Sequence, residues 1–406
     1  MVFPNVTGIV AEYNPFHNGH AYQLAKAREL TDAEALTVVL SADFVQRGEP
    51  AMLSMHERAK TAVQCGADLV IELPAIFSCH NAGVFANSAV NLLSATGIVA
   101  NISFGMEDTG WDLLNAADIV IKESNSFKTL LKKNLEKGYS FAEARINALD
   151  FCMPGAGKIL QGANNSLALN YAAAVVKNHP EIKLVPVQRA SVSHDELTPC
   201  GKFASASAIR ALAKENRFNE AKHFLPDCSA ETVEKNMKNG TAYISDEKLW
   251  AVLRTLLLRH SAEETAACGE LSEGIENKFK YEALSAKSFE EWLERCTSRR
   301  YPKGRIRRQA MQLLIGIDRW TNRAAQRLGV PYIRVLAMNA TGRQLLKTMK
   351  ETATLPIITK CGDAKFSSYA ETIMRYDMLA SELRLGFLPA GHTGSAHAEK
   401  PYMELD

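Results

Sequence analysis

The 406-residue sequence lacks several features that would each point to a class of protein. Its eight cysteines stand singly and form no Cys-x-x-Cys pair, so neither a zinc knuckle nor a redox pair is indicated. No apolar run reaches the ~18–20 residues that a membrane span needs, and the N-terminus shows no charged-then-apolar signal region. The sequence therefore predicts a cytoplasmic protein without a membrane partner, most of whose cysteines are small buried residues in a reducing compartment.

A strong excess of charge of one sign is also absent, because the formal net charge is only +2. Nucleic-acid binding cannot be argued from the whole chain and would have to come from a local patch. What is present is an ordinary globular composition, with 47% hydrophobic and 23% charged residues. At this length two or three domains are expected.

The first half of the sequence alternates short apolar segments with segments of helical pattern. Strands are predicted at residues 6–11, 35–40, 69–73, 101–104 and 183–187. Helices are predicted at residues 21–30, 56–64, 87–94, 111–146 and 167–177. This βαβ rhythm predicts an α/β fold, with a Rossmann-like parallel-sheet nucleotidyltransferase domain over residues 1–215.

The pattern changes after about residue 215. No further strand is predicted, and apolar residues recur at helical spacing. Residues 216–388 are therefore predicted to form an α-helical domain that follows the parallel-sheet domain. The last stretch, residues 389–406, shows no periodicity and is predicted to be a flexible tail.

The residues behind the first predicted strand combine two histidines with a glycine. His17, Gly19 and His20 stand where that strand gives way to a helix. A helix N-terminus offers free N–H groups and the positive end of a dipole, and a glycine allows close approach of a ligand. Two imidazoles three residues apart can donate to phosphate oxygens and steady charge that builds there. The pattern favours a nucleotidyl-transfer site, with a polar turn as the alternative.

Four further segments could contact a nucleotide. Gln46 and Arg47 follow the second strand and Gly105 follows the fourth, where open α/β sheets bind their ligands. Asn164 opens a helix, and Arg189 ends the fifth strand. Surface loops, a turn glycine and a helix N-cap are the structural alternatives for these residues.

Ser207 and Arg210 complete the fourth segment. A serine at a helix start with an arginine three residues on makes a compact anion cradle. A capping serine beside an exposed arginine is the alternative.

The second half contains one dense cluster of positive charge. Seven cations lie within fourteen residues, with Tyr301 among them: Arg295, Arg299, Arg300, Lys303, Arg305, Arg307 and Arg308. Arginine together with tyrosine suits RNA phosphates and an unstacked base. A basic, solvated helix face is the alternative.

Taken in order, these segments resemble the bacterial tRNA(Met) cytidine acetate ligase family, within the broader nucleotidyltransferase superfamily. The resemblance is carried by residues 12–20, 44–50, 68–74, 104–105, 164–167 and 204–210, and residues 299–308 extend it into the helical half. Two positions depart from the family pattern. Ala42-Asp43 stands where Gly-Asn is expected, and Ser166 stands where an isoleucine is common.

The resemblance implies a ligase that uses ATP to activate acetate as acetyl-adenylate. The acetyl group would then move to N4 of the wobble cytidine of elongator tRNA(Met), giving N4-acetylcytidine. His17 and His20 would be catalytic. ATP would be bound by Val10, Ala11, Glu12, Tyr13, Asn14, Pro15, Phe16, His17, Asn18, Gly19, His20, Ala21, Tyr22, Gln23, Gly105, Asn164, Arg189, Ser207 and Arg210. The tRNA would be bound by Arg299, Arg300, Lys303, Arg305, Arg307 and Arg308.

The residue chemistry agrees with that activity. Attack of acetate on the α-phosphorus of ATP gives a mixed anhydride, so the protein has to position groups and neutralise charge rather than supply a nucleophile. Magnesium would accompany ATP, although no acidic cluster marks a protein site for it.

Two alternatives stay open. One is an adenylyltransferase that acts on a phosphorylated cofactor precursor, and the other is a non-enzymatic RNA-binding protein with a vestigial nucleotide site. The long helical extension with its basic cluster speaks against the first, and intact His17, Gly19 and His20 speak against the second.

Overall fold

The sheet that organises the protein runs in the order β10-β8-β5-β2-β1-β6-β7, with β9 paired to β8 outside this path. The structure, a computed structural model, describes residues 5–189, 201–363, 366–390 and 399–404. The strands are β1 (Val6–Ala11), β2 (Ala35–Ser41), β5 (Leu69–Leu73), β6 (Val99–Met106), β7 (Lys183–Gln188), β8 (Ile333–Met338), β9 (Ile357–Ile358) and β10 (Tyr402–Met403). Neighbouring strands are parallel except β5 and β8, which confirms the predicted α/β class.

The central strands are apolar because they are covered on both faces. All seven residues of β2 are buried, as is typical of strands in parallel sheets. Helix α1 (Asn18–Thr31) packs against β6 and β7, α2 (Met55–Gln64) against β5 and β8, and α4 (Ala82–Ala95) and α9 (Ala163–Asn178) against β6. The N-termini of α1, α2 and α4 carry capping side chains, for example Ser54 on α2 and Asn81 on α4.

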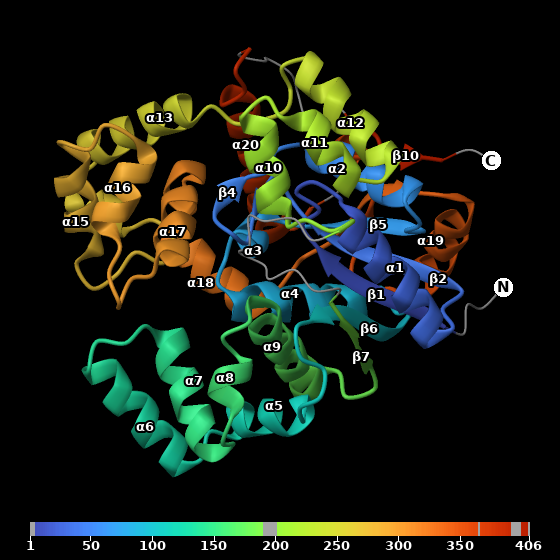
Figure 1. Cartoon of the computed structure of the whole chain (residues 1–406), viewed down its shortest axis with the longest axis horizontal. Coiled ribbons are helices and arrows are strands. Elements are labelled where there is room, and N and C mark those ends of the chain that lie inside the picture. Colours follow the sequence, from blue (N-terminus) through green and yellow to red (C-terminus); the bar gives the residue numbers. More distant parts are fainter. Residues whose placement is uncertain (1–4, 190–200, 364–365, 391–398, 405–406) are drawn as a thin grey trace.

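Two further groups of helices lie at one side of the sheet (Figure 1). The group at the lower left contains the stretch predicted as one helix over residues 111–146, which is divided into α5 (Leu113–Lys122), α6 (Asn125–Glu136) and the start of α7 (Phe141–Cys152), and it also contains α8 (Ala156–Ile159). The group above it contains α13 (Asp246–Arg259), α14 (Ala262–Ala266), α15 (Ile275–Ala283), α16 (Phe289–Cys296), α17 (Lys303–Ile315) and α18 (Arg319–Leu328).

The other elements complete the fold. They are the hairpin β3 (Phe44–Val45) and β4 (Glu49–Pro50), α3 (Ala75–Ser78), α10 (Ala206–Lys214), α11 (Phe218–Ala221), η1 (Lys222–Phe224), α12 (Asp227–Lys238), α19 (Ala340–Thr352), η2 (Cys361–Asp363) and α20 (Ser368–Gly386). Within the described residues no helix is both long and apolar enough to cross a membrane.

The expectation that strands end near residue 215 is wrong. Strand β8 lies inside the main sheet, antiparallel to β5, and Arg334 on it donates to the buried carboxylate of Glu72 over 3.1 Å. All six residues of β8 are buried. A short apolar run of this kind has no periodicity that distinguishes a strand from a helix, so the sequence pattern assigned it to the helical region. The helical division over residues 216–388 therefore includes part of the sheet.

The predicted flexible tail is also corrected in part. Strand β10 pairs with β8 through Tyr402 and Met403, so this part of residues 389–406 belongs to the sheet. Residues 391–398 and 405–406 lie outside the described part of the chain.

Candidate active site

A cavity of about 840 Å³ opens at the carboxyl ends of β1, β6 and β7. The strand order continues to β2 on one side of β1 and to β6 on the other, so the cavity lies where the winding of the sheet reverses. That is the usual ligand position in open α/β sheets. Helices α1, α4, α9, α10 and α17 and the β3–β4 hairpin supply the rest of the wall.

His17 and His20 are fixed by the start of α1. His17 is the N-cap residue, and its Nδ1 accepts from the backbone N–H of Gly19 over 3.1 Å. Reciprocally, Nδ1 of His20 accepts from the backbone N–H of His17 over 3.2 Å. Because each Nδ1 is an acceptor, the neutral rings carry their proton on Nε2. The two rings are stacked with centroids 3.7 Å apart and line the cavity, so the pair offers Nε2–H donors.

Gly19 makes room for the His17 ring and does not, as predicted, allow a ligand to approach the backbone. It does not line the cavity, and a Cβ at this position would lie 2.8 Å from Cε1 of His17. A side chain here would displace the His17 ring, so the glycine is required by the histidine.

His17 is neutral at physiological pH. The residue is 5% exposed, and burial lowers the pKa of its side chain to about 3, with smaller contributions from Arg189 and Arg210. A neutral imidazole with a fixed Nε2 proton can donate to a phosphate oxygen without paying for the desolvation of a charge.

The lowered pKa gives a pH dependence of stability. Below pH 6.5 the unfolded chain binds a proton at residue 17 that the folded protein rejects, so folded stability falls as the pH drops towards 3. Wild type should lose about 2 kcal/mol more than His17→Asn between pH 7 and pH 5. Asparagine is chosen because it also caps helices well. Urea denaturation of both ligand-free proteins at the two pH values measures the difference, and equal losses would contradict it.

Arg189 supplies positive charge at the end of β7. Its backbone N–H donates to Met106 O over 2.9 Å, which holds the residue beside the edge of the sheet. Within the described residues its buried Nε has no hydrogen-bond partner. A buried guanidinium nitrogen on the cavity wall is well placed for an anion.

Asn164 and Arg210 line the cavity but already have protein partners. The Asn164 amide and backbone N–H donate to Oε1 of Glu107, which occupies the start of α9. Arg210 donates to Asn14 O over 2.7 Å and to Oε1 of Glu49 over 2.6 Å. The N-cap of α10 is Ser205 rather than Ser207, although Ser207 also lines the cavity.

The β3–β4 hairpin carries Gln46 and Arg47 to the cavity. Oε1 of Glu12 accepts from the backbone N–H of Gln46 over 2.9 Å. At the tip, Gly48 has φ +78°, and a Cβ there would lie 2.5 Å from the backbone N of Arg308. The hairpin therefore packs directly on α17, and this close approach requires glycine.

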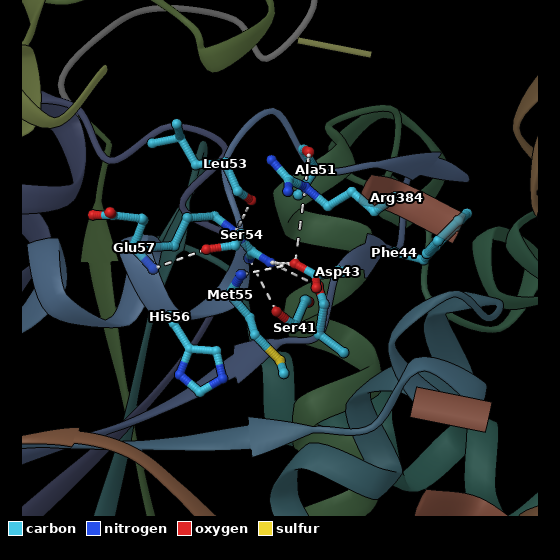
Figure 2. A network of polar contacts seen from close by, with 12 residues as sticks. Ser41, Asp43, Phe44, Ala51, Leu53, Ser54, Met55, His56, Glu57 and Arg384 are labelled. Atoms are coloured by element: carbon cyan, nitrogen blue, oxygen red, sulfur yellow. Dashed lines mark hydrogen bonds and ion pairs between the residues drawn. The ribbon is translucent and has the colours of Figure 1, made fainter. Parts of the chain in front are cut away.

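A buried network anchors the base of this hairpin (Figure 2). Asp43 lies between Arg384 and the start of α2, and its Oδ1 accepts from the backbone N–H of Met55 over 2.7 Å. The same oxygen lies 3.7 Å from Arg58 and 4.0 Å from Arg384. Both arginines also donate to backbone carbonyls, including Ala42 O and Ala51 O. Asp43 does not line the cavity, so its departure from the family pattern serves this network.

Asp43→Asn should therefore lower the free energy of unfolding by about 3 kcal/mol. The amide keeps an acceptor for Met55 but leaves two buried guanidinium groups facing it without a negative charge. Chemical denaturation measures the loss. Glu29→Gln is the matched control, since it removes an exposed partner of Lys26 and should leave the free energy of unfolding almost unchanged. A loss as small as that of the control would contradict the role given to Asp43.

The basic cluster divides into two parts. Lys303, Arg307 and Arg308 line the cavity from α17, and Arg308 donates to Gln46 O over 3.3 Å. The other predicted tRNA residues, Arg299, Arg300 and Arg305, do not line it.

Acidic and aromatic side chains accompany most of this cluster. Arg299 stacks on the Tyr139 ring at 3.4 Å and lies 3.7 Å from Glu143 of α7. Arg300 pairs with Glu273 at 3.2 Å, and Glu290 pairs with Lys303 and Arg307. The local positive field is smaller than a count of cations suggests, and Arg299 connects α7 with the loop before α17.

Most of the residues predicted to bind ATP lie on the cavity wall. They are Val10, Ala11, Glu12, Tyr13, Asn14, His17, His20, Gln23, Gly105, Asn164, Arg189, Ser207 and Arg210. Pro15, Phe16, Asn18, Gly19, Ala21 and Tyr22 do not line it. Asn18 instead donates to Lys202 O and His223 O, and Tyr22 packs against Phe203.

Sequence reasoning missed the apolar part of the wall. Phe85 from α4 and Tyr171 from α9 line the cavity beside Phe104, whose ring centroid lies 5.6 Å from that of Tyr171. Nothing in the sequence separates these aromatics from ordinary core residues. Ser166, the second departure from the family pattern, also lines the cavity, so a small hydroxyl side chain stands on the wall where an isoleucine is common.

Comparison with known proteins gives consistent matches. A family model described as HIGH Nucleotidyl Transferase matches residues 4–395. The tRNA(Met) cytidine acetate ligase of Listeria monocytogenes serovar 1/2a is 37% identical over 361 residues, covering 88% of this chain and 90% of that protein. The protein of the same name from Thermoanaerobacter sp. is 35% identical over 381 residues, covering 93% and 94%.

Solved structures agree with these matches. The crystal structure of Thermotoga maritima TmcAL bound with alpha-thio ATP superposes with a TM-score of 0.90 at 30% identity, over 98% of this chain and 99% of that one. The apo form superposes with a TM-score of 0.92 at 31% identity.

Proposed function

The chain belongs to the HIGH nucleotidyl transferase family and, within it, to the tRNA(Met) cytidine acetate ligases, and on this premise we propose its reaction. It joins acetate to ATP as acetyl-adenylate with release of pyrophosphate. It then transfers the acetyl group to N4 of the wobble cytidine of elongator tRNA(Met), with AMP as the leaving group. The protein acts in the cytoplasm, where its tRNA substrate is found.

The observation that carries this proposal is the stacked pair of neutral histidines. In the first step an acetate oxygen attacks the α-phosphorus, and negative charge builds on the phosphate oxygens as pyrophosphate leaves. The Nε2–H groups of His17 and His20 and the guanidinium of Arg189 stabilise that charge from the cavity wall. The rings cannot turn away because each Nδ1 is held by a backbone N–H.

The apolar and amide groups of the wall would position the nucleoside. Phe85, Phe104 and Tyr171 offer a flat surface for the adenine base, next to Gly105. This leaves the triphosphate to extend towards α1 and Arg189.

The tRNA would approach from the side of α17. Lys303, Arg307 and Arg308 connect the cavity with the exposed Arg299 and Arg300, so one surface can hold tRNA phosphates and deliver the cytidine to the adenylate. In this proposal residues 1–215 form the ATP-binding part and the helices of residues 216–388 the tRNA-binding part.

Magnesium would enter with ATP. Among the described residues no group of three or more metal-ligating side chains exists, so the phosphate oxygens of ATP would be the main ligands of the ion. Such an ion would lower the charge of the phosphates that the two neutral histidines contact.

Incubation with radiolabelled acetate, ATP and total tRNA tests the reaction. The expected result is ATP-dependent label in tRNA(Met), recovered as N4-acetylcytidine after digestion. Label in a dinucleotide formed from a cofactor precursor would favour the adenylyltransferase, and tRNA binding without any turnover would favour a non-enzymatic binder.

A further inference from the structure

Two cysteines far apart in the sequence meet at the surface of the α/β part. The Sγ atoms of Cys65 and Cys228 lie 2.6 Å apart, although 163 positions separate the residues. Cys65 ends α2 as its C-cap residue, and Cys228 is the second residue of α12. Both side chains are half-buried and are free thiols.

The packing of the two helices holds the thiols together. One turn before Cys65, Thr61 contacts Thr232 of α12, with 3.5 Å between their hydroxyl oxygens. Next to Cys228, the Ser229 hydroxyl donates to Phe16 O over 2.6 Å, beside His17. The contact between the cysteines therefore belongs to an ordered interface between α2 and α12, and a disulfide of about 2.05 Å needs little movement.

The environment of the pair favours oxidation. Cys228 lies in the first turn of α12, where the helix dipole stabilises a thiolate. The hydrogen bond from Cys65 lowers the pKa of Cys228 to about 7, while the same bond raises the pKa of Cys65. One thiol is thus an activated nucleophile and the other is the adjacent resolving thiol.

We propose that Cys65 and Cys228 form a reversible disulfide when the protein meets a peroxide. The Cys228 thiolate attacks one oxygen of hydrogen peroxide, which gives a sulfenic acid and releases the other oxygen as water after protonation. The Cys65 sulfur then attacks the sulfenic sulfur, its thiol proton leaves with the hydroxide as a second water, and the S–S bond forms. Two thiols supply the two electrons that reduce the peroxide, and a dithiol reductant reverses the reaction.

The disulfide would lock α12 onto α2 without changing the active site. Ser229 on α12 holds the carbonyl of Phe16, and the disulfide keeps that helix in the position it already has. The oxidised protein should therefore retain its KM for ATP and unfold at a higher temperature, because the bridge restricts the unfolded chain.

The experiment treats the full-length protein with one equivalent of hydrogen peroxide. All proteins carry Cys200→Ser, because Cys200 lies outside the described residues. The expected result is loss of two titratable thiols per chain, a peptide pair linked through Cys65 and Cys228 by mass spectrometry, a raised Tm and reversal by dithiothreitol.

Two kinds of variant sharpen the test. Cys65→Ser should form no bridge and should stop at sulfenic acid on Cys228, because one equivalent of peroxide delivers a single oxygen atom. Cys152→Ser, which removes another half-buried free thiol, should behave as the parent does. No linked peptide in the parent, or equal thiol loss in Cys65→Ser and the parent, would overturn the proposal. The peptide measurement on the parent decides the matter even if Cys65→Ser fails to fold.

Discussion

Replacement of His20 by alanine is expected to slow acetyl-adenylate formation by about 10²–10³-fold, equivalent to roughly 2.7–4 kcal/mol of transition-state stabilisation. The loss follows from removing one of two donors that face the phosphates. Affinity for tRNA should change little, because the cations predicted to bind tRNA lie on α17 and the loop before it. Pyrophosphate release with acetate and ATP, without tRNA, measures the first step.

A matched variant separates chemistry from local structure in this experiment. Nδ1 of His20 also accepts from the backbone N–H of His17, so alanine removes part of the helix cap. In His20→Gln the side chain can restore that bond but has no imidazole. Both variants should be slow, while His20→Gln should keep a Tm near that of wild type. Near-normal pyrophosphate release by either variant would refute a catalytic role of the ring.

The double variant Arg299→Ala/Arg300→Ala is expected to lose most tRNA acetylation and to spare acetyl-adenylate synthesis. Neither side chain lines the cavity, and both are exposed. The slope of log affinity for tRNA against log salt should become shallower by about 2, one unit for each lost phosphate contact. Filter binding at several salt concentrations, alongside pyrophosphate release, measures the two effects.

Arg307→Ala/Arg308→Ala should behave differently, because these residues line the cavity and Arg308 holds the β3–β4 hairpin through Gln46 O. This double variant should impair both acetyl-adenylate synthesis and tRNA acetylation. Lys347→Ala/Lys350→Ala on α19 removes the same charge from an exposed surface elsewhere and should affect neither. Wild-type tRNA affinity and salt slope in Arg299→Ala/Arg300→Ala would mean that this pair is only a solvated, ion-paired face.

The sequence predicted the structure best where short apolar runs mark the strands of the sheet. The predicted strands at residues 6–11 and 69–73 match β1 and β5, because strands buried on both faces read as short apolar runs between turns. His17 and His20 could be placed at a helix start because they directly follow the first of these apolar runs. Their tautomers, their stacking and the need for Gly19 depend on distances that a sequence pattern does not contain.

Features that depend on distant segments could not be predicted. Cys65 and Cys228 look unpaired in the sequence because only the packing of α12 on α2 brings them together. Phe85 reaches the cavity because α4 packs against β6 and α9, and its sequence neighbourhood is that of any buried helix. The cations of residues 299–308 seemed to form a single free patch because their acidic partners come from α7, α16 and the loop before α15.

The antiparallel strand β8 affects how the protein folds during its synthesis on the ribosome. Arg334 on β8 and its partner Glu72 on β5 are 262 positions apart, so β5 emerges long before the strand that covers its edge. Until then the nascent chain exposes a row of unpaired backbone groups on an apolar strand and a carboxylate without its counter-ion. Such edges invite aggregation during synthesis, and the native sheet can close only when translation is nearly complete.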